Sequence, residues 1–190
     1  MPKKEYTRKW FDADKSGLVN VLSEYKGSTK YLEIGSFEGR STCWFLANII
    51  TGPGSKAYCI DTWQGGFEHA GIDFDDVEDR FDKNTAGYRE KIVKLKGTSF
   101  EQLASLVRGH RNSFDVVYVD GSHTSWDVLS DCVLSFNLCK VGGIIGLDDY
   151  LWGEQNLNAP KPAIDSFLYI YDNFLQVIKK DYQVWVKRIS

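Results

Sequence analysis

The sequence predicts an α/β protein built on a seven-stranded, mostly parallel sheet. Short apolar segments alternate with helical patterns along the chain, the order typical of βαβ units. Phe114–Asp120 is rich in β-branched residues, and Gly143–Leu147 is apolar throughout, as expected for a strand covered on both faces. The turn between the last two apolar segments is too short for a parallel crossover, so we expect the last strand to be antiparallel.

The same patterns predict seven strands and five helices along the chain. Apolar segments bounded by glycine or polar turns predict the strands Tyr31–Gly35, Ala57–Asp61, Ile92–Leu95, Phe114–Asp120, Gly143–Leu147, Leu175–Ile178 and Tyr182–Val186. Helical spacing predicts helices at 41–50, 77–86, 99–108, 124–138 and 161–173, on both faces of the sheet. Residues 1–28 should form one or two helices that cover an edge, and residues 29–190 a single domain.

Composition excludes several classes of protein. The chain has 190 residues, of which 43% are hydrophobic, and a formal net charge of −3. A chain of this size can bury one real core, and its apolar content is too high for a disordered protein. The weakly acidic balance lacks the basic field that drives nonspecific nucleic-acid binding, so we expect no nucleic-acid partner.

The localisation that we expect is cytoplasmic. No run approaches the roughly 18 apolar residues that span a membrane, and the polar N-terminus does not resemble a secretory signal. The four cysteines do not have zinc spacing and should be reduced thiols in the core.

A glycine turn and a set of carboxylates mark the expected site. In an open parallel sheet, ligands bind at the carboxyl ends of the strands. The first strand is followed by Gly35 and Gly39 in a GxxxG spacing, which is neither the dinucleotide GxGxxG motif nor a Walker motif. Asp61 ends the second strand, where an acid can accept hydrogen bonds from ribose hydroxyls. The fourth and fifth strands end at Asp120 and at Asp148–Asp149.

Five segments carry a resemblance to a known family. YLEIGSFEGRST, CIDTW, LKGTS, VYVDGSHTSWDVLSDC and VGGIIGLDDY resemble the successive motifs of class I S-adenosylmethionine (SAM)-dependent methyltransferases. The similarity is strongest to small O-methyltransferase-like proteins with IDTW and DGSH motifs. It covers about residues 30–186, and it implies a Rossmann-like methyltransferase fold and SAM as the cofactor.

The resemblance also implies roles for individual residues. Gly35, Ser36 and Gly39 would approach the methionine part of SAM, with Glu33 and Ser41 near its amino and carboxylate groups. Asp61 would bind the ribose, with Thr62 and Trp63 beside the adenosine. Thr98 and Ser99 would follow the adenine edge, and Asp120 and Gly121 would border the sulfonium.

The acceptor half of the site involves acids and a histidine. Asp120, Asp148 and Asp149 offer three oxygen ligands suited to Mg²⁺ or another divalent cation. Catechol-type O-methyltransferases resemble this pattern but carry a lysine where this chain has His123, and an asparagine where it has Asp149. These differences resemble sugar O-methyltransferases, in which a histidine is the base. We therefore expect Asp120 and His123 to be catalytic in methyl transfer to a hydroxyl of a small molecule. Asp148 and Asp149 are expected either to bind the metal with Asp120 or to be hydrogen-bonded turn residues without a metal.

Other interpretations remain open at this stage. The chain could be a noncatalytic module with a degenerate methyltransferase fold that binds SAM, a nucleotide or a protein. A nucleic-acid or protein methyltransferase is disfavoured because no base-flipping motif is present. Acceptor selection would come from the 63–90 or 149–160 loops, the N-terminal segment, or a second subunit of a homodimer.

Further local predictions concern an acidic segment, several aromatic residues and a histidine. Glu68–Asp82 carries seven acids and one arginine, and we expect a solvated loop and helix start rather than a lid. Trp63, Tyr150 and Trp152 lie where an aromatic wall or surface packing is expected. Trp126 and Phe136 have the spacing of core residues, and His69 is expected to be exposed.

Overall fold

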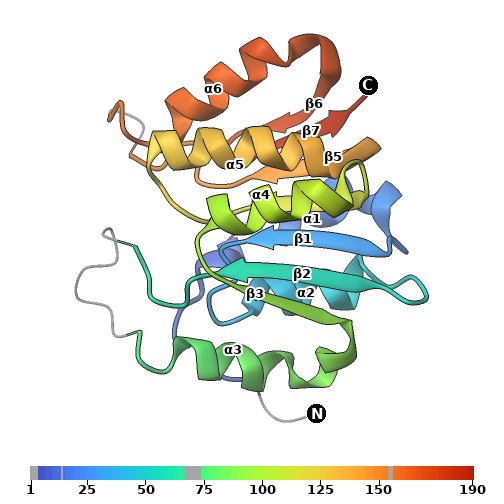
Figure 1. The fold of residues 1–190 in the computed structure, drawn as a ribbon, viewed down its shortest axis with the longest axis vertical. Coiled ribbons are helices and arrows are strands. Elements are labelled where there is room, and N and C mark those ends of the chain that lie inside the picture. Colours follow the sequence, from blue (N-terminus) through green and yellow to red (C-terminus); the bar gives the residue numbers. More distant parts are fainter. Residues whose placement is uncertain (1–3, 14, 67–73, 154–155) are drawn as a thin grey trace.

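The computed structural model describes residues 4–13, 15–66, 74–153 and 156–190. Its centre is a seven-stranded sheet in the order β3-β2-β1-β4-β5-β7-β6 (Figure 1). β7 pairs antiparallel with both β5 and β6, whereas the pairs among β1 to β5 are all parallel. The predicted fold class, including the antiparallel last strand, is confirmed.

The observed elements lie close to the predicted ones. The strands are β1 (Lys30–Ile34), β2 (Lys56–Asp61), β3 (Ile92–Lys96), β4 (Phe114–Val119), β5 (Cys139–Leu147), β6 (Leu175–Lys180) and β7 (Val184–Arg188). The α-helices are α1 (Lys15–Val21), α2 (Arg40–Asn48), α3 (Val77–Thr85), α4 (Ser99–His110), α5 (Ser125–Leu138) and α6 (Pro160–Ile170). Short 3-10 helices are η1 (Trp10–Ala13), η2 (Ser23–Tyr25), η4 (Ala86–Lys91) and η5 (Asp172–Phe174).

The last strand begins two residues later than predicted. Tyr182 and Gln183 belong to the turn between β6 and β7, where Asp181 N donates to Gln183 O at 3.1 Å and Gln183 N donates to Asp181 Oδ1 at 3.1 Å. An aspartate that accepts a hydrogen bond from the backbone two residues on stabilises such a turn. The turn therefore presents Tyr182 at the carboxyl end of the parallel strands instead of burying it in the sheet.

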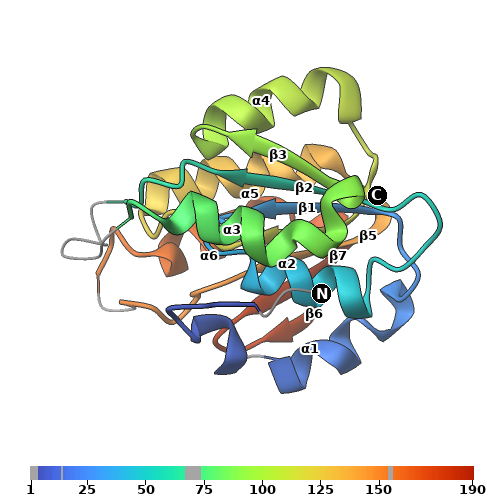
Figure 2. The ribbon, with the colours of Figure 1, turned by 90° about the horizontal axis from the view of Figure 1, so that it is seen from below.

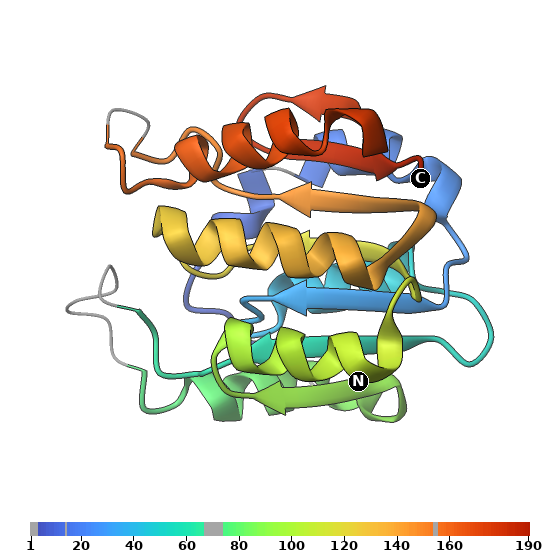
Figure 3. The same cartoon turned by 45° about the horizontal axis from the view of Figure 1, so that its top comes forward.

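Helices cover both faces of the sheet. α4, α5 and α6 lie side by side over one face (Figure 3), and their apolar residues form one core cluster with β1, β4 and β5. α1, α2 and α3 lie on the opposite face (Figure 2) and form a second cluster. β4 is buried at every position, so its mostly apolar sequence follows from its place between the two layers. The carboxylate of its one charged residue, Asp115, accepts from Thr29 N at 2.9 Å and from Lys30 N at 2.8 Å.

The N-terminal segment packs on one face of the sheet, and α1 also lies beside the edge strand β6, where a Cβ on Gly17 would be 3.1 Å from Lys179 Nζ. Phe11, Leu18 and Leu22 are buried in the core cluster that contains Phe45 of α2 and Trp185 of β7. Apolar side chains on this segment are thus buried together with the main domain. The spacing of apolar residues predicted helices there but could not say which surface they would cover.

Trp126 was predicted to lie in the core, and this was wrong. It is 60% exposed at the start of α5, whereas Phe136, about three turns further along, is buried as predicted. The first turn of α5 projects beyond the sheet edge, so helical spacing alone does not bury it. His69 lies outside the described residues.

The four cysteines lie in the core, as the sequence predicts. Cys43, Cys59, Cys132 and Cys139 are all buried and form no disulfides.

Among the helices of the described ranges, none combines the length and apolar character needed to cross a bilayer.

Gly146 of β5 supports a tight contact that gives a testable prediction. A Cβ at this position would lie 2.4 Å from the indole of Trp185, which is fully buried. We expect Gly146→Ala to destabilise the fold by about 1–3 kcal/mol through overpacking. In α4, a Cβ on Gly109 meets nothing within 4 Å, so Gly109→Ala should stabilise by about 0.4–1 kcal/mol. Urea unfolding of both variants checks these opposite signs, and equal effects would contradict the packing argument.

Candidate active site

The carboxyl ends of the parallel strands meet at one edge of the sheet, as the arrowheads of β1, β3 and β5 show in Figure 3. β1 and β4 are neighbours in the middle of the sheet, and the chain order runs outward from them in both directions. A crevice for a ligand forms at such a switch point in a doubly wound sheet. The predicted site residues lie at the ends of these strands and on the turns and helix starts that follow them.

The turn after β1 is held against the end of β4. Gly35 and Gly39 adopt φ angles of 83° and 76°, and Phe37 is a non-glycine residue at φ 45°. A Cβ on Gly35 would lie 1.8 Å from the carbonyl oxygen of Asp120. Asp120 N in turn donates to Ile34 O at 2.9 Å. Glycine is therefore required at position 35 both for its conformation and for the close approach of the two chains.

Asp61 connects the turn after β1 with the end of β2. One carboxylate oxygen accepts from Phe37 N and the other from Trp63 N, both at 2.7 Å. Burial raises the pKa of Asp61, and these backbone donors oppose that shift. Each carboxylate oxygen has a second lone pair, so the group can fix the turn and still accept hydrogen bonds from a ligand.

The side chains next to Asp61 differ in their surroundings. The indole of Trp63 is buried against Phe81 and donates to Phe37 O at 2.9 Å, so this side chain supports the turn from within the core. Thr62 is half-buried, and its hydroxyl accepts from Gln64 N at 3.2 Å. The indole of Trp63 is therefore turned into the core, and its place beside an adenosine stays a prediction.

Glu33 lies under the glycine turn. Its carboxylate is fully buried and accepts from Tyr31 OH at 2.8 Å and from the Thr42 hydroxyl. Burial raises the pKa of Glu33, and the Thr42 and Ser41 hydroxyls oppose the shift. Ser36 is also buried, and its hydroxyl has no hydrogen-bond partner in the described structure. A buried orphan hydroxyl in a turn that a side chain could not occupy is consistent with a ligand at this place.

Thr98 and Ser99 lie at the start of α4, beside the end of β2. Thr98 caps the helix by accepting from Glu101 N at 3.4 Å, and Gly97 N donates to Asp61 O at 3.0 Å. The structure therefore brings the predicted adenine-edge residues next to the predicted ribose-binding acid.

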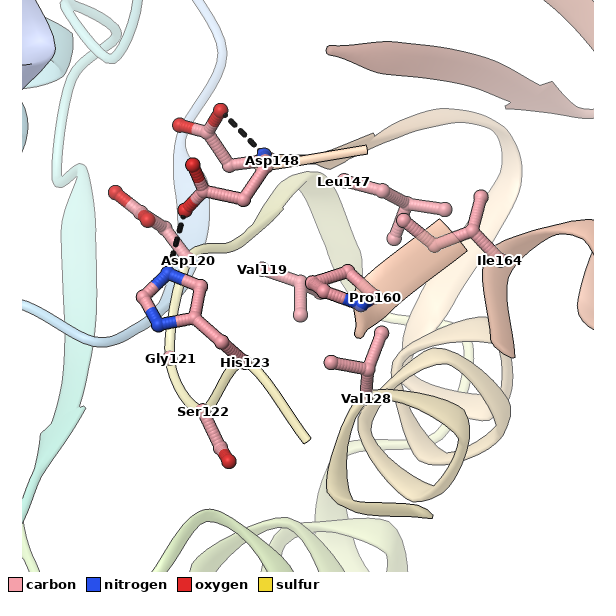
Figure 4. A pocket seen from close by; sticks show the side chains of 11 residues that line it. Val119, Asp120, Gly121, Ser122, His123, Val128, Leu147, Asp148, Pro160 and Ile164 are labelled. Carbon is pink, nitrogen blue, oxygen red and sulfur yellow. Dashed lines mark hydrogen bonds and ion pairs between the residues drawn. The ribbon is translucent and has the colours of Figure 1, made fainter. Parts of the chain in front are cut away.

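A histidine–aspartate pair lies across the ends of β4 and β5. His123 Nε2 and Asp149 Oδ2 are 2.7 Å apart, and Asp149 has a left-handed φ of 57° (Figure 4). Tyr182 OH donates to the other oxygen, Asp149 Oδ1, at 3.1 Å. In Figure 4, His123 and Asp120 lie on the polar side of a small pocket whose opposite wall includes Val128 and Ile164. This arrangement can hold an imidazole in one orientation and stabilise its protonated form.

Asp148 faces the interior and holds the Asp149 turn. Its Oδ1 accepts from Asp149 N at 2.8 Å, and its Oδ2 accepts from Gln183 Nε2 at 3.0 Å and from Tyr118 OH. Gln183 is itself buried and accepts from Trp185 Nε1 at 3.1 Å. The hydrogen bonds thus run from the core of β7 to the backbone that presents Asp149.

Two of the three acids predicted as metal ligands hydrogen-bond to other residues of the chain. Asp148 accepts hydrogen bonds at both oxygens, and Asp149 contacts His123 and Tyr182. Within the described ranges, no three His, Cys, Asp or Glu side chains are grouped so that they could hold a metal ion. Among the described residues, Asp120, Asp148 and Asp149 do not form a ready-made cation site in this arrangement. The metal role stays a prediction.

Aromatic residues complete the acceptor side of the site. Trp152 stacks on His123, with ring centroids 4.6 Å apart and an interplanar angle of 26°, and is 39% exposed. Tyr150 is buried, and its OH donates to Asp165 at 2.8 Å. Sequence reasoning missed Tyr182 and Gln183. The antiparallel pairing of β7 with β5 could have indicated them. A strand that pairs with β5 in this way begins near Asp148, so the turn before it lies at the site.

The fold and the site together define a Rossmann-like protein of the methyltransferase class. The chain superimposes on the O-methyltransferase TomG of Streptomyces achromogenes, solved with SAM, with a TM-score of 0.69 at 17% identity, over 100% of this chain and 84% of TomG. At that identity, the likeness concerns the fold alone.

Sequence similarity identifies the family. The family model described as "Methyltransferase domain" matches residues 32–150, which include every predicted site residue, and the chain belongs to this family. It is 27% identical over 180 residues to tapetum-specific methyltransferase 1 of Arabidopsis thaliana, over 93% of this chain and 72% of that protein. It is 26% identical over 170 residues to caffeoyl-CoA O-methyltransferase 1 of Eucalyptus globulus. That match covers 88% of this chain but only 63% of the relative, less than two thirds of its length.

Proposed function

We propose that this chain transfers the methyl group of SAM to a hydroxyl of a small molecule, with sugars among the candidate acceptors. The proposal depends on the loop after β4, which contacts the predicted cofactor half of the site and carries the histidine of the predicted acceptor half. The Asp120–Gly121 end of β4 touches the glycine turn, and His123 on the same loop is paired with Asp149. The names of the relatives and of TomG support methyl transfer to oxygen.

The cofactor half consists of residues that fit SAM. Gly35 admits no side chain against the end of β4, and the buried Ser36 hydroxyl lies in the same turn. Asp61 would bind the ribose hydroxyls, and Thr98 and Ser99 the adenine edge. When bound, SAM supplies a methyl group on a positively charged sulfur, which departs as a neutral thioether.

The acceptor half deprotonates the hydroxyl and aligns it. With Nε2–H donated to Asp149 Oδ2, the basic lone pair of His123 is at Nδ1, which would take the acceptor proton. Asp149 would stabilise the resulting imidazolium, and Tyr182 and the backbone bond from Asp148 would keep Asp149 in place. Alignment of the oxygen with the methyl carbon for in-line displacement is the main contribution, worth roughly 7–11 kcal/mol.

A labelled-methyl assay tests the proposal. We expect the purified chain, incubated with SAM carrying a tritiated methyl group and a panel of sugars and catechols, to transfer label to at least one hydroxyl compound. Transfer of label only to protein or nucleic acid would contradict the assignment of the acceptor class. EDTA and added Mg²⁺ in the same assay decide the metal role independently.

Asp61→Ala is expected to weaken binding of S-adenosylhomocysteine (SAH) by about 10- to 100-fold, since a hydrogen bond to a charged group contributes about 1.5–3 kcal/mol. The variant also loses the bonds from Phe37 N and Trp63 N, so thermal unfolding must be followed together with calorimetry. Asp172→Ala, at an exposed acid in η5 away from this edge, is the matched control and should bind SAH normally. Unchanged SAH affinity in a folded Asp61→Ala protein would remove Asp61 from the cofactor site.

A further inference from the structure

The N-terminal segment is attached to the outside of the glycine turn through a buried carboxylate. Residues 5–12, which we call the strap, lie on the same side of the sheet as α2 and α3 (Figure 2). Thr7 N and the Thr7 hydroxyl donate to the two carboxylate oxygens of Glu38, each at 2.7 Å. Glu38 is 1% exposed and directly precedes Gly39 in the turn. Because charge-assisted hydrogen bonds are the stronger ones, this contact fixes the strap against the turn.

Two residues of α3 complete the contact. Arg80 Nε donates to Glu38 Oε1 at 2.6 Å, so the buried carboxylate has a cationic partner. Asn84 is 3% exposed, and its Nδ2 donates to Glu5 O at 2.8 Å and to Glu38 O at 2.9 Å. Its Oδ1 accepts from Glu5 N at 2.8 Å. The strap, the turn and α3 therefore share one hydrogen-bond network.

The strap also contacts the turn on both sides of this carboxylate. Arg40, the first residue of α2, donates from Nε to Asp12 Oδ1 at 3.0 Å. The Trp10 ring packs on the Phe37 ring, with centroids 5.2 Å apart. Phe37 N in turn donates to Asp61 Oδ2 at 2.7 Å. The contacts of the strap thus reach the backbone that holds the acid predicted to bind the ribose.

The turn has a backbone conformation that its own residues do not favour. Phe37 adopts a left-handed φ of 45°, which is unfavourable for a residue that has a Cβ. A conformation of this kind persists only where surrounding contacts hold it. The hydrogen bonds to Glu38 and the packing of Trp10 on Phe37 are contacts of this kind, and they come from outside the turn.

We propose that Glu38 is a positioning residue that couples docking of the strap to the shape of the cofactor turn, so that strap docking and SAM binding stabilise each other. The inference rests on the proposed function, because the turn is predicted to bind the methionine part of SAM. Coupling of this kind is reciprocal. If the docked strap tightens SAH binding by some factor, SAH favours the docked strap by the same factor.

Calorimetry with SAH tests the contact from both sides. Glu38→Gln should bind SAH about 5- to 50-fold more weakly, within the usual range of coupling between two sites. Thr7→Val keeps the backbone bond and should have a smaller effect in the same direction. Because effects of residues in one contact do not add, the double variant should bind SAH no more weakly than Glu38→Gln alone. Additive losses would contradict a shared action through this contact.

Asp115→Asn is the matched control. Asp115 is also a buried carboxylate that accepts from two backbone N–H groups, of Thr29 and Lys30, but it lies at the amino end of the parallel strands. Its variant should lose stability and bind SAH with the affinity of the unaltered chain. A loss of SAH affinity equal to that of Glu38→Gln would show a general effect of destabilisation and overturn the proposal.

The thiol of Cys43 reports docking of the strap without a measurement of activity. It is 3% exposed and is hydrogen-bonded to Tyr6 of the strap, whereas Cys132 is buried in the core cluster on the other face of the sheet. Labelling with iodoacetamide, followed by mass spectrometry, gives the rate at each thiol. We expect saturating SAH to slow labelling of Cys43 relative to Cys132, and Thr7→Val to accelerate it.

The outcomes separate this inference from the function on which it rests. SAH affinity equal to that of the unaltered chain in a folded Glu38→Gln protein would overturn the role of Glu38. If that variant does not fold, Thr7→Val decides, and unchanged SAH affinity together with an unchanged ratio of Cys43 to Cys132 labelling would overturn it. If the unaltered chain does not bind SAH, the proposed function itself fails.

Discussion

Gly35→Ala is expected to abolish detectable SAH binding and to lower the thermal stability of the chain. The substitution places a methyl group 1.8 Å from the Asp120 carbonyl oxygen at a φ of 83°. A left-handed conformation costs a non-glycine residue about 1–2 kcal/mol. The clash cannot be relieved locally, because Asp120 N is bonded to Ile34 O in the adjacent strand. The turn and the end of β4 must therefore separate, and both are predicted to border SAM.

The Gly54→Ala variant separates the cost of a left-handed backbone conformation from the cost of a steric clash. Gly54 has a φ of 69° but nothing within 4 Å of a Cβ, so its variant carries only the conformational cost. We expect it to lose stability modestly and to bind SAH with the affinity of the unaltered chain. Calorimetry and thermal unfolding of the two variants make the comparison. SAH binding by Gly35→Ala within twofold of the unaltered chain would show that the close approach of the two loops is not needed for the cofactor.

His123→Ala is expected to reduce kcat by about 10²- to 10⁴-fold, the usual contribution of a general base, and to leave SAH affinity unchanged. The expectation follows from the position of His123 on the acceptor side, held by Asp149 at 2.7 Å and stacked on Trp152. The measurement is steady-state methyl transfer with an acceptor found in the labelled-methyl assay, together with SAH calorimetry. Equal loss of turnover and of SAH affinity would show that the variant damages the cofactor site and not the base.

Asp149→Asn distinguishes the histidine–aspartate pair from a metal site. An asparagine retains an oxygen that can ligate a cation, but it does not carry the charge that stabilises an imidazolium. We expect kcat to fall at least about tenfold, with no restoration by added Mg²⁺. Tyr182→Phe removes the hydrogen bond to Asp149 Oδ1 and should have a smaller effect in the same direction. Full activity of Asp149→Asn that disappears with EDTA would assign Asp149 to a metal instead.

The fold could be predicted from sequence because burial on both faces leaves a strong local pattern. β4 and β5 are apolar because helices cover both of their sides, and α4 has a helix-start threonine, Thr98, that caps it. The N-terminal segment was different. Its helices were predicted, but whether Leu18 packs on a face or an edge depends on β7 and α2, far away in the sequence.

Site residues near the end of a single strand could be predicted from sequence. Residues whose orientation depends on segments far apart in the chain could not. Asp61 is the last residue of β2, and Asp120 and His123 lie within four residues of the end of β4, so sequence position places them at the sheet edge. The orientation of Asp148 toward the core depends on Gln183 and Tyr118, and no local pattern indicates it.

The central claim is that the edge formed by the glycine turn, Asp61 and the end of β4 binds SAM. Isothermal titration calorimetry of the unaltered chain with SAH tests it most directly. We predict saturable binding with one site per chain. Absence of binding to SAH and to SAM by a folded, monodisperse preparation would contradict the claim.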